Sequence, residues 1–165
     1  PESLLPLLPC SCRNTGKYSW LSWKNSIFVT RRTIYTLTDN MMKVIHSELA
    51  PKAVGPYSQA IVAGGFVFAS GQLPIDPATG EFAEGGIKEQ TRQSLTNVTH
   101  VLAEAGIDLS HVVKTTVFLS DMANFAAMNE VYATFFSEPY PARSAVAVKT
   151  LPKNALVEVE VVAAL

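Results

Sequence analysis

The sequence predicts an α+β domain over residues 41–165, with the element order β-β-β-α-β-α-β-β. Three observations lead to this class. Short apolar segments come before the first helical pattern, each of the two helical patterns is followed by a strand-like segment, and two strand-like segments close the chain. The expected strands are residues 43–46, 60–63, 66–70, 112–119, 144–148 and 156–163, and the expected helices are residues 88–105 and 122–136.

The first strands include a predicted hairpin. Segments 60–63 and 66–70 are apolar and flank Gly64-Gly65, a pair that suits a two-residue hairpin turn. Residues 74–80 are rich in proline and turn-forming residues and are expected to form a loop. Residues 112–119 are rich in β-branched side chains, which favour a strand.

Each expected helix has an apolar face and an end signal. Gly106 follows the first helix where a left-handed residue would end it. Asp121 can cap the second helix, and Pro139 and Pro141 prevent its continuation. The apolar positions at helical spacing are Leu95, Val98, Leu102 and Ala105 in the first helix and Phe125, Met128, Val131, Tyr132 and Phe135 in the second.

The strand pattern also predicts self-association. Two helices can cover only one face of such a sheet. Residues 66–69 and 161–164 are nevertheless apolar at successive positions, which is typical of strands buried on both faces. We therefore expect the uncovered face to contact another copy of the chain in a homo-oligomer.

Composition excludes several classes of protein. The chain has 165 residues, is 48% hydrophobic and 16% charged, and so should fold around a core. A net charge of −1 argues against a general nucleic-acid binder, which would carry a basic patch. No apolar run approaches the length that spans a bilayer, so no membrane partner is expected. The only cysteines are Cys10 and Cys12, which excludes a thiol nucleophile in residues 41–165 and fits a reducing compartment.

Residues 1–40 differ from the rest of the chain. They carry five basic residues against Glu2 and Asp39 and are rich in serine and threonine, as organelle transit peptides are. The interpretation that we favour is a start at Met41 or Met42, with residues 1–40 outside the fold, either wrongly assigned to the protein or left over from cloning. The expected location is then cytoplasmic, with a mitochondrion or plastid as the alternative.

The strongest chemical signals lie near the end of the chain. Arg143 enters an apolar strand, and an arginine fork binds a carboxylate through two parallel hydrogen bonds. Glu158 and Glu160 share one face of the last strand, with Cα atoms roughly 6.5–7 Å apart. A glutamate can orient or deprotonate a water. The alternatives are a surface or ion-paired arginine and a solvated pair of glutamates.

Other candidates carry weaker signals. Tyr57 follows a Gly-Pro turn, and its alternative role is that of an aromatic plug. Ser70 and Gly71 end a strand, where Gly71 allows a ligand to approach the backbone, although spacing alone favours a simple turn. The three histidines lack metal-ligand spacing, and there is no phosphate-binding glycine motif. No metal or cofactor is expected.

Four motifs together resemble the reactive intermediate deaminase family, RidA, also called the YjgF family. They are GPYSQA at 55–60, SGQLPIDPATGE at 70–81, KTTVFLSDM at 114–122 and PARSAVAVKTLPKNALVEVE at 141–160. The resemblance extends from Met42 to Ala164. It implies a chorismate-mutase-like sheet with two helices on one face, assembled as a homotrimer around a central barrel with sites between subunits.

The resemblance also implies an activity. Family members hydrolyse reactive 2-enamine and 2-imine acids, such as 2-aminoacrylate, 2-iminopropanoate and 2-iminobutanoate, to 2-keto acids and ammonia. By position, Arg143 matches the residue that binds the substrate carboxylate and Glu158 the residue that places the water. Tyr57, Ser70, Gly71 and Asn129 match residues of the pocket. Ala145 stands where many relatives have cysteine, so a backbone contact is retained and a thiol function is not.

A second function remains open from the sequence. Some relatives were first described as translation inhibitors, ribonucleases, chaperones or metabolic regulators. A small-carboxylate-sensing module would use the same arginine without turnover, whereas nuclease action would need a basic groove, against which the net charge of −1 argues. Glu158 separates the two functions, because only an enzyme needs it for rate.

Overall fold

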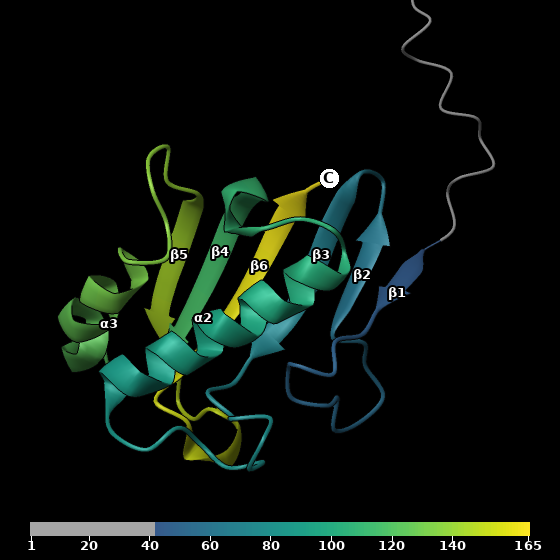
Figure 1. Ribbon diagram of the computed structural model, residues 1–165. Helices are drawn as coiled ribbons and strands as arrows, with labels where there is room; N and C mark the ends of the chain where they lie inside the picture. Colours follow the sequence, from purple (N-terminus) through teal and green to yellow (C-terminus); the bar gives the residue numbers. More distant parts are fainter. Residues whose placement is uncertain (1–41) are drawn as a thin grey trace, which may run out of the picture. The chain divides into compact units, whose positions relative to one another are not determined.

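The computed structural model describes residues 42–165. The predicted leader at 1–40 lies outside these residues. The described elements follow the predicted order, with three short 3-10 turns added (Figure 1). The strands are β1 (Lys43–Ile45), β2 (Ala60–Ala63), β3 (Phe66–Gln72), β4 (Val112–Leu119), β5 (Ala142–Ala147) and β6 (Val157–Ala164), and the helices are α2 (Ile87–Glu104) and α3 (Phe125–Tyr132).

All six strands form one mixed sheet in the order β1-β2-β3-β6-β4-β5. Only β4 and β5 pair in parallel, and the other neighbours are antiparallel. The last strand, β6, therefore lies inside the sheet between β3 and β4, while β5 forms an edge. This arrangement makes β6 the strand that connects the two halves of the sheet.

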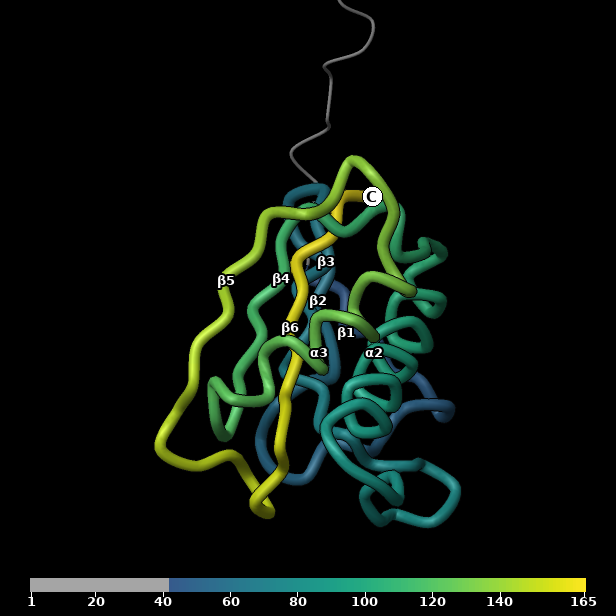
Figure 2. The backbone as a smooth tube through the Cα atoms, turned by 90° about the vertical axis from the view of Figure 1, so that its left-hand side faces the viewer, coloured from purple at the N-terminus to yellow at the C-terminus, as the bar shows by residue number. Residues whose placement is uncertain are grey.

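Both helices lie on one face of the sheet, as predicted. α2 connects β3 to β4, and α3 connects β4 to β5. Both connections join parallel strands and move in the same direction across the sheet, so two right-handed crossovers place both helices on the same face. Figure 2 shows the two helices on one side of the strands, with the opposite side uncovered. The α+β class is therefore confirmed.

The β2–β3 hairpin forms where the glycine pair predicted it. Gly64 and Gly65 have φ values of 58° and 82°, and the left-handed conformation at both central residues is that of a type I′ turn. The turn sets a register in which Ala63 pairs with Phe66 and Ala60 with Ala69.

Helix α2 is shifted by one residue toward the N-terminus from its predicted bounds, 88–105. Leu95, Val98 and Leu102 are fully buried, which confirms the predicted apolar face. The chain leaves the helix through Gly106 at φ 79°, and the N–H of Ile107 donates to the carbonyl of Leu102. This left-handed glycine is the expected end signal.

The predicted second helix, 122–136, is too long. Residues Met122–Asn124 form a 3-10 turn capped by the Asp121 carboxylate, which accepts from the N–H of Ala123, and the α-helix covers Phe125–Tyr132. After Tyr132 the bonds tighten to i→i−3, because the N–H groups of Thr134 and Phe135 donate to residues three positions back. Three residues of the predicted stripe, Met128, Val131 and Tyr132, are buried, and Phe125 and Phe135 are partly buried. Phe136, which the stripe did not include, packs into the core beyond the helix.

Strand β6 alternates between two environments. Val157, Val159, Val161 and Ala163 are buried against the helices, while the residues between them are partly exposed on the other face. Glu158 and Glu160 therefore share the uncovered face, as predicted. Strand β5 begins two residues before its predicted start.

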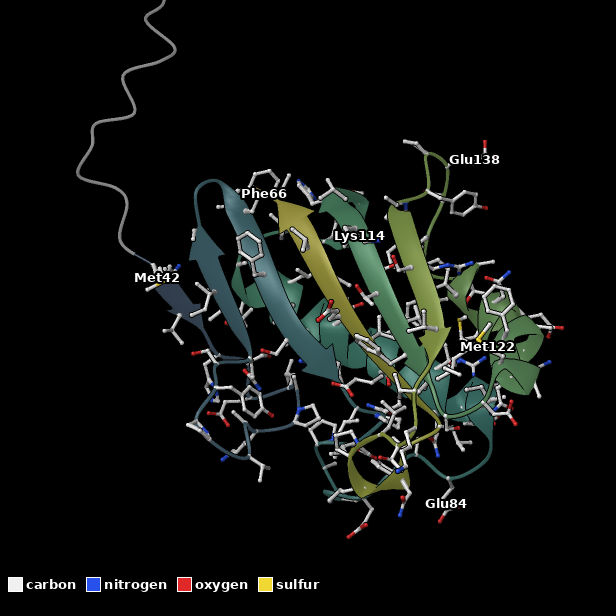
Figure 3. The ribbon with its side chains drawn as sticks, turned by 180° about the vertical axis from the view of Figure 1, so that it is seen from behind. Met42, Phe66, Glu84, Lys114, Met122 and Glu138 are labelled. Carbon is white, nitrogen blue, oxygen red and sulfur yellow. The ribbon has the colours of Figure 1, made fainter. Side chains whose placement is uncertain are left out.

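The uncovered face carries a large apolar surface. Phe66, Phe68 and Val146 are 41%, 48% and 46% exposed. Figure 3 looks onto this face, where Phe66 and Lys114 are labelled. The two phenylalanine rings contact each other, with centroids 6.3 Å apart. Such a surface is what the sequence predicted for a face that contacts a second copy.

Two buried amides attach loops to this framework. Gln59, 2% exposed, accepts from the N–H of Ser47 at 2.6 Å and donates to the carbonyls of Ser47 and Pro51 at 3.1 and 2.9 Å. Asn97 of α2 donates to the carbonyls of Leu73 and Ile75 at 3.0 and 2.9 Å. The loops after β1 and β3 are thus fixed by side chains rather than by strand pairing.

Among residues 42–165, no helix combines the length and the apolarity that crossing a bilayer requires.

We predict that Gln59→Ala lowers the free energy of unfolding by about 2–4 kcal/mol, because it leaves several buried backbone groups without partners. Urea denaturation would measure this loss. Thr96→Ala is the control, since its hydroxyl only bonds to the carbonyl of Arg92 on an exposed helix surface. Equal stabilities of the two variants would contradict the assigned role of Gln59.

Candidate active site

A cavity of about 730 Å³ opens where β3 and β6 meet the loops around them. Its lining includes four of the predicted site residues: Tyr57, Ser70, Gly71 and Glu158. They come from three separate motifs of the sequence, and the fold places them together.

An irregularity in the pairing of β3 with β6 shapes the end of the sheet that borders the cavity. The register between β3 and β6 shifts between Ala69 and Gln72, so Ser70 and Gly71 lie in a bulge. Ser70 is fixed by two bonds, from its N–H to the carbonyl of Gln59 at 2.9 Å and from its hydroxyl to the carbonyl of Ser58 at 2.7 Å. The hydroxyl proton is therefore engaged in structure, and a lone pair of the oxygen remains available.

Gly71 is required by the close approach of Glu158. A Cβ atom at position 71 would lie 1.9 Å from Oε1 of Glu158. The backbone angle φ of Gly71 is not in the left-handed region, so the need for glycine here is steric. The carboxylate packs directly on the β3 backbone.

The environment of Glu158 raises its pKa. Burial disfavours the ionised form, and the negative charge of Glu160 adds to the effect. A carboxylate with a raised pKa is a better proton acceptor near neutral pH than an ordinary surface glutamate. Glu158 is thus suited to receive and return a proton.

Tyr57 forms another part of the cavity wall. It is 50% exposed, and its hydroxyl accepts a weak bond of 3.4 Å from the N–H of Val54. Gly55, at φ 126°, turns the chain before it. The phenol is accessible to a ligand, unlike that of a fully packed aromatic plug.

Arg143 and Asn129 do not line this cavity. Nη1 of Arg143 donates to Oδ1 of Asn129 at 2.7 Å. The guanidinium lies 4.6 Å from the ring centre of Tyr132 and 5.6 Å from that of Phe125. No carboxylate of the described residues lies within salt-bridge distance of Arg143. The guanidinium N–H groups that do not bond to Asn129 are therefore not paired with an acidic side chain.

Strand register places Arg143 and Glu158 on opposite faces of the sheet. Arg143 pairs with Thr115, which is fully buried on the helix side. Glu158 pairs with Phe118, three residues further along β4 and therefore on the other side. One subunit cannot bring these two side chains to the same small ligand. Ala145 is on the helix side with Arg143 and packs against the core.

The residues that hold the Arg143 side chain in place were not predicted from the sequence. The hydroxyls of Tyr132 and Thr115 lie 2.9 Å apart in the core, and burial raises the pKa of the Tyr132 phenol. Tyr132 therefore holds its ring in place beneath the guanidinium. The only signal was a tyrosine in an apolar helix stripe, whose hydroxyl must find a buried partner.

The histidines have structural contacts. Nδ1 of His100 lies 2.6 Å from the carbonyl of Leu49, so α2 holds the loop that borders the cavity. His46 contacts Glu48, and His111 contacts Asp108. In residues 42–165 no three His, Cys, Asp or Glu side chains gather as a metal site would require.

The profile of the family described as Endoribonuclease L-PSP matches residues 47–165. The chain belongs to this family. A RutC family protein of Pyrococcus horikoshii is 57% identical over 123 residues, covering 74% of this chain and 98% of the relative. A goat protein (Capra hircus) named 2-iminobutanoate/2-iminopropanoate deaminase is 45% identical over 121 residues, covering 73% of this chain and 88% of the relative.

Solved structures agree with the sequence relatives. A Yersinia pestis protein described as YyfA, of unknown function and of the conserved Rid protein family, is 48% identical with a TM-score of 0.74. The match covers 76% of this chain and 100% of that one. The resemblance to the RidA family is therefore confirmed, in both sequence and fold.

We predict that Gly71→Ala lowers the rate of any reaction that Glu158 catalyses by about 100-fold, because the new methyl group displaces the Glu158 carboxylate. Steady-state kinetics would measure the loss. Gly86→Ala is the matched control, since a Cβ there meets only Oε2 of Glu89, at 4.0 Å. Similar activities of the two variants would contradict the packing role of Gly71.

We predict that Glu160→Gln moves the acidic limb of the pH–rate profile to lower pH. Glu160 raises the pKa of Glu158, so removing its charge lowers that pKa, and an ionised base then persists at lower pH. The profile of kcat/KM against pH would test this, with Glu104→Gln as a distant charge control. If Glu158 acts in its protonated form instead, the alkaline limb would move to lower pH and the acidic limb would stay in place.

Proposed function

We propose that this protein hydrolyses reactive 2-enamine and 2-imine acids to 2-keto acids and ammonia. The substrates are 2-aminoacrylate, 2-iminopropanoate and 2-iminobutanoate. The single observation that carries the proposal is that the carboxylate of Glu158 has a raised pKa and packs against Gly71 in the wall of a cavity. A relative named for this deaminase activity supports it.

The chemistry needs one well-placed acid–base group. Water adds to the imine carbon, Glu158 accepts a proton from that water, and the proton passes to the nitrogen. The added hydroxyl then loses its proton to the nitrogen, the C–N bond breaks, ammonia leaves, and the carbonyl forms. An enamine first becomes the imine by gaining a proton on its β-carbon and losing one from its nitrogen. The imine carbon is already electrophilic, so a covalent nucleophile is not needed, which fits the engaged proton of Ser70.

Arg143 binds the substrate carboxylate in this mechanism. Its guanidinium lies over the ring of Tyr132 and is oriented by Asn129, which leaves its remaining N–H donors for a bidentate bond. Fixing the carboxylate also fixes the imine carbon relative to the water. Ala145 lies on the same face of β5 as Arg143, and its methyl side chain can take no part in proton transfer.

Arg143 and Glu158 meet only if two subunits share a site. They lie on opposite faces of one sheet, Arg143 is on the edge strand β5, and the face that carries Glu158 is uncovered and apolar. We propose a homotrimer in which this face lines a central barrel. Each cleft then combines Tyr57, Ser70, Gly71 and Glu158 of one subunit with Arg143 and Asn129 of its neighbour.

We predict that Arg143→Ala and Glu158→Gln each abolish turnover and that mixed oligomers of the two regain about a quarter of wild-type activity, if subunits mix at random. Clefts that take Glu158 from one variant and Arg143 from the other are intact. Ammonia release from 2-iminopropanoate, generated by an amino-acid oxidase, measures the rate.

The controls separate assembly from chemistry. Each variant should keep the trimer mass in light scattering, and a mixture of two Arg143→Ala preparations should stay inactive. Full activity of Arg143→Ala would refute the mechanism. A folded wild-type trimer that binds 2-keto acids without accelerating hydrolysis, and keeps that affinity in Glu158→Gln, would identify a carboxylate-sensing module instead.

A further inference from the structure

The turn that enters β6 has an unusual backbone. Lys153 and Asn154 have φ values of 55° and 60°, and they are the only non-glycine residues with positive φ in the part of the chain that the structure describes. Asparagine tolerates this left-handed region, whereas a lysine there is uncommon. Strained residues of this kind persist where the surrounding structure imposes them, and they cluster at functional sites.

The ends of the turn are firmly anchored. Leu151 and Ala155 are 7% and 0% exposed. The N–H of Asn154 donates to the carbonyl of Leu151 at 3.0 Å. The N–H of Leu156 donates to Oε1 of Gln90 on α2 at 2.9 Å. The anchors therefore hold Lys153 in a conformation that its own backbone does not favour.

This conformation places Lys153 on the wall of the cavity that contains Glu158. The other lysine of the lining, Lys52, forms an ion pair with Glu48 at 3.7 Å. No carboxylate of the described residues lies within salt-bridge distance of Lys153. Lys153 is thus a cation of the cavity without a protein counter-ion.

A three-carbon imine does not use such a cation. Under the proposed function, Arg143 already binds the only carboxylate of 2-iminopropanoate, and the imine carbon faces Glu158. A cavity of about 730 Å³ holds a longer molecule. A second anionic group at the far end of a longer substrate would supply the counter-charge that Lys153 lacks among the described residues.

We propose that the site also accepts dicarboxylic 2-imino acids, and that Lys153 binds their second carboxylate. The inference rests on the proposed deaminase function. The reaction is unchanged: water adds to the C=N carbon, the C–N bond breaks, and ammonia leaves with a 2-keto dicarboxylic acid. Lysine suits this task, because its flexible stem can follow chains of different length.

The test compares substrates of two charges. Iminosuccinate and 2-iminoglutarate are generated by oxidases acting on aspartate and glutamate, and 2-iminopropanoate by an oxidase acting on alanine. The wild type should accelerate keto-acid release from all three. Lys153→Asn should lower kcat/KM at least about tenfold for the dicarboxylic imines and less than about twofold for 2-iminopropanoate.

Asparagine and glycine keep the turn intact. Both tolerate a left-handed backbone, so Lys153→Asn and Lys153→Gly should unfold at the same temperature as the wild type or higher. Lys149→Asn, which removes the same charge from an exposed loop position outside the cavity lining, is the matched control and should not change the substrate ratio.

Two results would overturn the inference. If 2-iminopropanoate is hydrolysed faster but the dicarboxylic imines are not, the substrate class is wrong and the proposed function stands. If Lys153→Asn lowers kcat/KM equally for all three imines, Lys153 does not bind the second carboxylate. Acceleration of none of them would refute the proposed function itself.

Discussion

The alternation of β6 is the constraint on which the rest of the structure depends. Its valines fill the core beneath the helices, and its glutamates must then lie on the opposite face. Because β6 pairs with both β3 and β4, its register also fixes what each glutamate meets. Glu158 falls beside the bulge at Gly71, where there is no side chain to exclude it.

The same register separates Arg143 from Glu158, the two residues on which the proposed chemistry depends. Arg143 is tied to the helix side by Tyr132, Phe125 and Asn129, and no rotation of its side chain within the subunit would bring it through the sheet to Glu158. Under the proposed function, a single subunit would hold the acid–base group on one face of the sheet and the carboxylate-binding group on the other. Assembly and activity are therefore expected to be lost together when the uncovered face is disrupted.

Patterns that act over a few residues were enough to predict much of the fold. The Gly64-Gly65 turn, the end of α2 at Gly106 and the shared face of Glu158 and Glu160 all follow from local rules. The second helix was predicted too long because its apolar stripe continues after the hydrogen bonds tighten. The separation of Arg143 from Glu158 could not be predicted, since it depends on which strands are neighbours.

The cavity is built from features that do not favour folding on their own. Glu158 is partly desolvated beside a like charge, and Lys153 adopts a left-handed backbone. Both are held by groups outside the cavity: the valines of β6 and the anchors at Leu151, Ala155 and Gln90. Local rules fail at these positions because the packed core on the helix side determines them. A substitution that relaxes either position should thus stabilise the subunit while weakening what the cavity can bind or convert.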